Sequence, residues 1–203
     1  MINKYKKLNR NFDKWLQKKY PNWDISIALR YLPIVDDIKS SFKKGSKILD
    51  IGSGDYGINV YMGNGFNLVG TDIENGKNEK FKVIKASVVD LPFENESFDV
   101  VVSVDMVEHL LPEDRKKAIS EMIRVAKDRA YITFPSGKDS EVVDRILYKY
   151  YKFTHKKELP FLNEHIEYGL PSPSEIEKYI ISSGIKKGQN VSFQKKLNTN
   201  IFL

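Results

Sequence analysis

The sequence has no cysteine among its 203 residues, which excludes disulfide bonds and thiolate metal sites. It also has no apolar run near the roughly 20 residues that a membrane-spanning helix needs. The N-terminal residues are polar and rich in lysine, and no apolar segment follows them, so we expect no secretory signal. These absences favour a soluble protein that has no membrane partner, and we expect a cytoplasmic location.

What the chain does contain is the composition of a globular domain: 41% of its residues are hydrophobic and 30% are charged. Its length is sufficient for one domain with a sizeable core. The net charge of +6 suggests a nucleic-acid partner, but the lysines alternate with acids along the chain, as on an ordinary solvated surface. A nucleic-acid substrate therefore stays open without being favoured.

One glycine-rich stretch of the sequence indicates the fold of the rest of the chain. The apolar run 47–51 leads into the turn Gly52-Ser53-Gly54-Asp55-Tyr56-Gly57, and this pattern predicts a strand, a glycine-rich turn and a helix, the first unit of a nucleotide-binding α/β sheet. Gly52 and Gly54 allow a sharp turn and the close approach of a ligand. Asp50 places a negative charge beside that ligand, so a diphosphate is repelled there and an ammonium group is attracted.

Strand and helix patterns then alternate with short links, which predicts an α/β fold with a doubly wound, mostly parallel sheet. Phe98 to Val104 is the most continuous apolar run, as expected of a central strand buried on both faces. We expect strands over residues 47–51, 66–71, 80–85, 98–104 and 130–134. We expect helical segments over residues 8–20, 26–42, 57–64, 106–111, 115–127, 138–151 and 173–183.

We expect a single domain over residues 1–203. It comprises an N-terminal helical cap (1–44), a ligand-binding core (45–135), an excursion (136–173), and a C-terminal helix and strand (174–203). Residues 152–173 read as an irregular lid or substrate loop. Residues 191–196 are a further strand candidate, and the apolar end 201–203 suits a strand that returns to the sheet.

Acidic residues stand at the carboxyl ends of the expected strands, where such sheets bind their ligands. Asp72 ends the second strand, where a carboxylate can accept hydrogen bonds from both hydroxyls of a ribose. Asp105 follows the fourth strand, and Asp90 lies in the loop after the third. We therefore expect Asp50, Asp72, Asp90 and Asp105 on one edge of the sheet.

Four separated motifs agree in order and spacing: the Asp50-to-Gly54 turn, Asp72, the pair Asp90-to-Phe93 with Ser97-to-Ser103, and Glu108-His109-Leu110. Over residues 45–135 the chain resembles the class I S-adenosylmethionine-dependent methyltransferases. The resemblance implies their Rossmann-like sheet of the seven-stranded type, S-adenosylmethionine as cofactor and S-adenosylhomocysteine as product. The sequence departs from the family pattern at Tyr56, because the third glycine comes one residue later, at Gly57.

The resemblance also assigns roles to residues. Asp50, Gly52 and Gly54, with Ser53 between the glycines, would hold the methionine end of the cofactor. Asp72 would bind the ribose, and Ser103 and Asp105 would lie beside the reactive methyl group. The adenine would be bound by Ile73, Ser87, Val88, Val89 and Asp90.

The reaction we expect is methyl transfer to a small-molecule or saccharide-like acceptor held under the excursion. Asp105 and His109 are the candidate catalytic residues, with His155 and His165 as further candidates for a general base. We expect no metal, since Glu108-His109 and Glu164-His165 lack the usual ligand spacing. Three alternatives stay open: an RNA methyltransferase, an NAD(P)-dependent oxidoreductase that uses the G-x-G-x-x-G turn, and a non-catalytic domain of the same fold.

Overall fold

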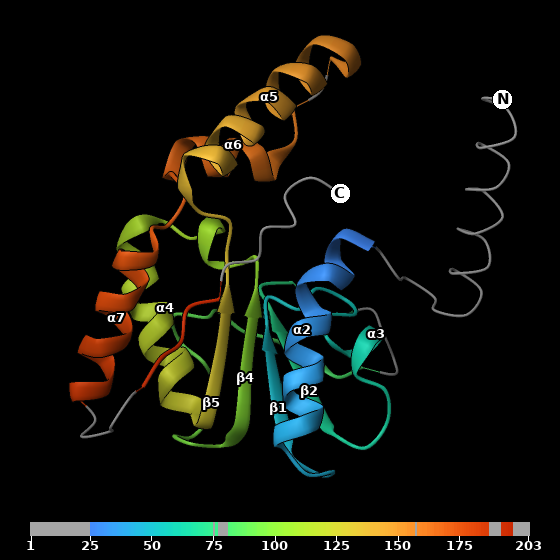
Figure 1. The fold of residues 1–203 in the computed structure, drawn as a ribbon, viewed down its shortest axis with the longest axis vertical. Helices are drawn as coiled ribbons and strands as arrows, with labels where there is room; N and C mark the ends of the chain where they lie inside the picture. The colour runs from blue at the N-terminus through green and yellow to red at the C-terminus, as the bar shows by residue number, and fades with distance from the viewer. Residues whose placement is uncertain (1–24, 75, 77–80, 157, 187–191, 197–203) are drawn as a thin grey trace, which may run out of the picture.

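The structure is a computed structural model that describes residues 25–74, 76, 81–156, 158–186 and 192–196 (Figure 1). Every structural statement below concerns these residues. The helix expected over 8–20 and the terminal strand expected over 201–203 lie outside them, as do residues 1–24 of the expected helical cap.

Five parallel strands form one sheet in the order β3-β2-β1-β4-β5. The chain moves outward from β1 to β3 and then returns to the other side of β1, so a topological switch point lies between β1 and β4. The α/β, doubly wound, parallel fold is thereby confirmed. The strands are β1 Lys47–Ile51, β2 Asn67–Asp72, β3 Val83–Lys85, β4 Phe98–Val104 and β5 Ala126–Thr133.

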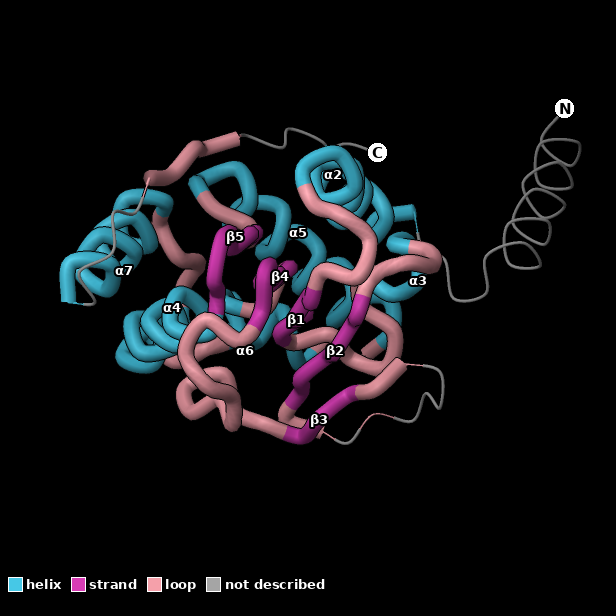
Figure 2. The backbone as a smooth tube through the Cα atoms, turned by 90° about the horizontal axis from the view of Figure 1, so that it is seen from below, coloured by secondary structure: helices cyan, strands magenta, loops and turns pink. Residues whose placement is uncertain are grey.

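Helices cover both faces of this sheet, as Figures 1 and 2 show. Helices α2 (Ile25–Ser41) and α3 (Asn59–Met62) lie on one face, and α4 (Pro112–Val125) and α7 (Pro173–Lys186) lie on the other. Pro33 lies inside α2, within the helix expected over 26–42. Helix α2 lies within the expected cap (1–44), and the four helices together form the layers that enclose the strands.

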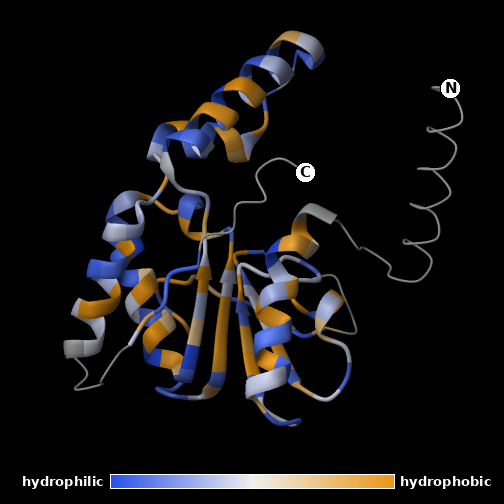
Figure 3. Ribbon diagram, viewed as in Figure 1, coloured by the Kyte–Doolittle hydropathy of each residue, from blue (hydrophilic) through white to orange (hydrophobic). Residues whose placement is uncertain are grey.

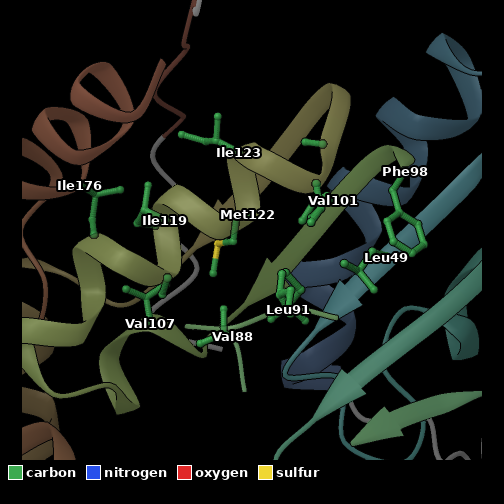
Figure 4. Close-up of a cluster of buried hydrophobic side chains, with 14 residues drawn as sticks. Leu49, Val88, Leu91, Phe98, Val101, Val107, Ile119, Met122, Ile123 and Ile176 are labelled. Carbon is green, nitrogen blue, oxygen red and sulfur yellow. The ribbon is translucent and has the colours of Figure 1, made fainter. Parts of the chain in front are cut away.

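Each face has its own hydrophobic core. One core joins β1 and β4 to α2 and α3 through side chains such as Val35, Ile38 and Ile58. The other joins the same strands to α4 and α7, with Met122 and Ile176 among its buried members (Figure 4). Strands β1 and β4 are apolar along most of their length (Figure 3), and burial on both faces explains why their bounds match the sequence prediction.

Beyond the carboxyl ends of the strands, α5 (Gly137–His155) and α6 (Pro160–Tyr168) form a helical hairpin (Figure 1). The expectation of an irregular segment over 152–173 is wrong in this respect. Helix α5 continues to His155, and Pro160 begins α6 at a first-turn position, where its missing N–H costs nothing. Leu162 anchors α6, because it is the buried residue of that helix.

Smaller differences concern element ends. Strand β5 begins at Ala126 instead of 130, although its first residues are mostly exposed. The segment 106–111 contains a single 3₁₀ turn, η1 (Val107–His109), and α4 begins at Pro112. Residues 192–196 form no strand, which corrects that expectation. Among the described helices, none combines the length and the apolar character that a bilayer crossing requires.

Candidate functional site

The turn after β1 requires glycine at two positions for different reasons. Gly52 has a φ of 71°, and a Cβ there would lie 2.6 Å from Cγ of Met106. Gly54 has a φ of 54°, and nothing lies within 4 Å of the position that a Cβ would take. The first glycine thus lets the turn pack on the loop after β4, and the second leaves an open place beside the backbone.

Asp50 lies beneath this turn and is completely buried. Its Oδ2 accepts hydrogen bonds from the Ile58 N–H at 2.6 Å and from the Tyr31 hydroxyl at 3.2 Å. Burial raises the pKa of Asp50 to about 7, against these two bonds, which lower it. The structure therefore shows Asp50 tying the turn to α2 and to the chain entering α3; its contact with the cofactor stays a prediction.

Asp72, the last residue of β2, reaches across to the same turn. Its Oδ2 accepts from the Gly54 N–H at 2.9 Å, and its Oδ1 accepts from the Glu74 N–H at 3.2 Å. A carboxylate has about four acceptor positions, so both oxygens can still accept a hydroxyl. The neighbouring Ile73 is 74% exposed, and an exposed isoleucine at this edge offers an apolar face to a flat ring.

The segment 87–90 contributes a second wall. Ser87 and Asp90 form an isolated bridge, with the Asp90 N–H donating to the Ser87 carbonyl at 3.0 Å. Val88 is buried in the core, Val89 is half-buried against it, and the Asp90 carboxylate side is exposed. Ser87 and Asp90 are thus the exposed members of this segment, and Val89 is partly accessible.

Two residues predicted near the methyl group differ in access. Ser103 is completely buried within β4, opposite Ile51 of β1, so it lies inside the sheet. Asp105 follows the end of β4 with a φ of 49°, a left-handed conformation that is uncommon outside glycine. Its carboxylate pairs with the Arg30 guanidinium of α2. The side chain of Asp105 is therefore closer to the edge, with a cation already beside it.

His109 lies in η1, and its Nδ1 is 2.7 Å from Oε2 of Glu164 in α6. Burial lowers the pKa of His109, although the Glu164 carboxylate opposes this. The ring lies 4.9 Å, centroid to centroid, from that of His165. The Nδ1 of His165 is in turn 2.9 Å from Oδ2 of Asp144 in α5.

Glu108 lies beside His109 and His165 and forms a cluster with them. It is 1% exposed, and burial raises its pKa to about 7. One ligand atom each from Glu108, His109 and His165 lies within 4.8 Å of the others. His155 is elsewhere: it is exposed on α5 and bonded to the Thr154 hydroxyl at 2.7 Å.

Sequence reasoning missed the groups that hold these side chains. Arg30, Asp144 and Glu164 are far from their partners in the sequence, so no local pattern identified them. Arg115 of α4 is another: buried in the described structure, it donates to the carbonyl oxygens of Tyr168 and Gly169 at 3.3 and 2.5 Å. It thereby fixes the C-terminal end of α6, where a positive charge also interacts favourably with the helix dipole.

These features define a class of protein: a doubly wound α/β fold with acidic side chains at the carboxyl ends of its strands, around the switch point. The open place at Gly54 is one that a Cβ would fill, and Asp72 lies directly beside it. Both suit a ribonucleoside that carries no phosphate. We therefore find that the residues present fit the cofactor predicted from the sequence.

The comparisons with known proteins show which family the central part of the chain is similar to. Residues 49–134 match the family described as "Methyltransferase domain". The match covers less than half of the chain, and over these residues the chain is similar to the class I S-adenosylmethionine-dependent methyltransferases. The sequence-based resemblance is confirmed.

The individual relatives have low sequence identity to this chain. An uncharacterized protein of Methanocaldococcus jannaschii is 29% identical over 71% of this chain and 67% of its own length. Norajmaline N-methyltransferase of Rauvolfia serpentina is 32% identical over 55% of this chain and 42% of its own. This chain thus spans less than half of that enzyme.

Among solved structures, Haemonchus contortus phosphoethanolamine N-methyltransferase 2, in complex with phosphomonomethylethanolamine and S-adenosylhomocysteine, matches with a TM-score of 0.53 at 21% identity. The match covers 76% of this chain and 36% of that one. At this identity the likeness supports the fold.

Proposed function

We propose that the protein transfers a methyl group from S-adenosylmethionine to a small, polar acceptor. The observation that carries this proposal is the contact between Asp72 and the Gly54 N–H. It joins the acid at the end of β2 to the glycine turn after β1, so one carboxylate both fixes the turn and faces the open place beside it. The match of residues 49–134 to the methyltransferase family supports the same conclusion.

Different residues of the chain would bind different parts of the cofactor. Gly52, Ser53 and Gly54 would place backbone against its methionine end, with Asp50 holding the turn from beneath. Asp72 would accept from the ribose hydroxyls. The adenine would lie between the exposed Ile73 and the segment that carries Val89 and Asp90.

When bound, S-adenosylmethionine supplies a methyl group on a positively charged sulfur, which makes that carbon an activated electrophile. The acceptor's lone pair forms the new bond to this carbon as the carbon–sulfur bond breaks, leaving S-adenosylhomocysteine. The acceptor's proton, if it has one, then leaves to a base or to water. The protein has to align the two reactants and exclude water.

Asp105 and His109 are the catalytic residues we propose for the acceptor side. Asp105 lies at the switch-point end of β4, beside Arg30. His109 lies one turn further along the chain, with its pKa lowered by burial, so its ring is neutral at pH 7 and its free nitrogen can accept a proton. Helices α5 and α6 lie beyond this edge (Figure 1), and we propose that the acceptor binds under them.

Two observations bear on the kind of acceptor. The relative from Rauvolfia serpentina is named for a small-molecule acceptor, which favours such a substrate here. The net charge of +6 supports the RNA alternative. RNA binding would weaken steeply with added salt, whereas binding of a small molecule would not.

Calorimetric titration tests the proposal. S-adenosylmethionine and S-adenosylhomocysteine should each bind one per chain, and NAD should bind far more weakly or not at all. Asp72→Ala should weaken S-adenosylhomocysteine binding at least tenfold, because two charge-assisted hydrogen bonds to ribose are lost.

The matched control is Asp128→Ala. Asp128 is an exposed aspartate near the opposite, amino-terminal end of the sheet, in β5, so its removal should leave binding unchanged. Tight binding of NAD, or equal affinities in the two variants, would refute the proposal.

A further inference from the structure

The cluster at η1 and α6 has the composition of a metal site, although the sequence spacing gave no sign of one. Two of the chain's three histidines, His109 and His165, meet the buried carboxylate of Glu108, with one ligand atom from each within 4.8 Å of the others. Imidazole nitrogens and a carboxylate oxygen are the ligands that zinc and its first-row neighbours prefer.

Both imidazoles are oriented by carboxylates. Nδ1 of His109 faces Glu164 at 2.7 Å, and Nδ1 of His165 faces Asp144 at 2.9 Å. An ionised carboxylate can only accept, so in the neutral form of each imidazole Nδ1 carries the proton and Nε2 keeps its lone pair. This carboxylate–histidine arrangement is the outer shell that metal-binding histidines usually have.

Two of the ligand atoms that remain have no hydrogen-bond partner in the described part of the chain. Within the described part of the chain, Nε2 of His165 and Oε2 of Glu108 are buried and make no hydrogen bond. The His165 side chain is 8% exposed and Glu108 is 1% exposed. An unmade hydrogen bond on a buried polar atom costs about 1–3 kcal/mol. A single ligand that binds both His165 and Glu108 would remove this cost at both residues.

We propose that Glu108, His109 and His165 bind a divalent first-row transition metal ion, with Zn²⁺ as the reference ion. A tetrahedral zinc ion, with ligands at about 2.0–2.2 Å, brings its ligand atoms to about 3.3–3.5 Å from one another. Small side-chain rotations from the present separations achieve this. Three protein ligands leave one coordination position open.

The open position gives the ion a role next to the methyl-transfer site. Glu108 and His109 come soon after Asp105 in the chain, separated from it by Met106 and Val107, so the ion lies close to the acceptor region proposed above. A hydroxyl or amine of the acceptor that occupies the open position loses its proton more readily, because the metal lowers its pKa. With the ion bound, the proton leaves to solvent and Nε2 of His109 is a ligand; the role of His109 as a base proposed above then applies only to the metal-free protein.

The proposal does not depend on the proposed function, because metal binding can be measured with no methyl donor present. Untagged protein is treated with EDTA, dialysed, and titrated with Zn²⁺ in a calorimeter. We expect one ion per chain with micromolar or tighter affinity, and no comparable heat from Mg²⁺, which prefers oxygen ligands. Co²⁺ should give visible absorption bands of low-symmetry coordination.

The matched variants are His165→Ala and His155→Ala. The first removes a ligand and should weaken Zn²⁺ binding at least a hundredfold, whereas the second removes the exposed histidine of α5 and should change nothing. Asp144→Asn should weaken binding by about 10–100-fold through the orientation of His165. Circular dichroism spectra compared across the variants confirm that each is folded.

Two results would overturn the proposal. One is a folded wild-type protein that takes up no Zn²⁺ or Co²⁺. The other is equal Zn²⁺ affinity in His165→Ala and His155→Ala, which would mean that binding is not at this cluster. Binding of Zn²⁺ without binding of S-adenosylhomocysteine would leave the metal site standing and refute the methyltransferase proposal alone.

Discussion

Arg30 of α2 forms an ion pair with Asp105, the residue that follows the last position of β4. The pair joins a helix that precedes the sheet to the edge where the methyl group is expected. Arg30 also acts on Glu108, whose pKa its positive charge lowers against the larger effect of burial. One cation thus balances two acids at the proposed site.

A charge at this place should affect the two forms of the cofactor differently. S-adenosylmethionine carries a positive sulfur that S-adenosylhomocysteine lacks. Arg30→Gln should therefore raise the ratio of S-adenosylmethionine to S-adenosylhomocysteine affinity several-fold, and Asp105→Asn should lower it. Titrations of both ligands into both variants measure this. A ratio that moves the same way in both variants would contradict the assigned position of Asp105.

A Cβ at position 52 would clash with Met106, so adding one methyl group there should have a strong effect on stability and binding. Gly52→Ala should destabilise the fold by about 1–3 kcal/mol and weaken cofactor binding at least tenfold, because the turn must move away from Met106. Gly63→Ala is the control, since Gly63 has the same φ of 71° with nothing within 4 Å of its Cβ position. It shares the backbone strain without the clash. Urea unfolding and ligand titration of both variants check the difference.

Asp50 should make stability depend on pH. Its folded pKa of about 7 lies above the unfolded value of about 4, so the native state binds the proton more tightly. Its stabilising contribution is complete below about pH 4 and is lost as the pH rises to 7, amounting to a few kcal/mol. In Asp50→Asn, this decline should be absent. Denaturant unfolding of both proteins between pH 4.5 and 8 measures it, and parallel curves would contradict the assignment.

The position of α6 should depend on Arg115. Arg115→Met removes two hydrogen bonds to carbonyl oxygens at the end of α6, a loss of about 1–3 kcal/mol. Hydrogen exchange in residues 160–168 should become faster, while the strands keep their protection. Lys116→Met is the control, since Lys116 is exposed on the same helix. Unchanged exchange in the Arg115 variant would show that other contacts hold α6.

The parts of the fold that the sequence predicted well are those with a strong local cause. Strands β1 and β4 are apolar runs buried on both faces, and their bounds matched. The start of β5 was missed because Lys127, Asp128 and Arg129 are polar and exposed, so they lack the pattern of a buried strand. The pairing that makes them a strand comes from β4, which local propensity does not show.

The same distinction applies to the site. The glycine turn and Asp72 belong to motifs with fixed spacing, so they could be named from the sequence. The cluster of Glu108 and His165 could not, because it forms only when α6 folds back over η1. Its supporting acids, Asp144 and Glu164, come from two different helices, and each reads alone as an ordinary surface charge.

The most direct test of the central claim is a crystal structure of the protein with S-adenosylhomocysteine. We predict the ribose hydroxyls within hydrogen-bonding distance of the Asp72 carboxylate, and the adenine beside Ile73. A ligand bound elsewhere, or a dinucleotide whose pyrophosphate rests on the turn at Gly52 and Gly54, would contradict the account.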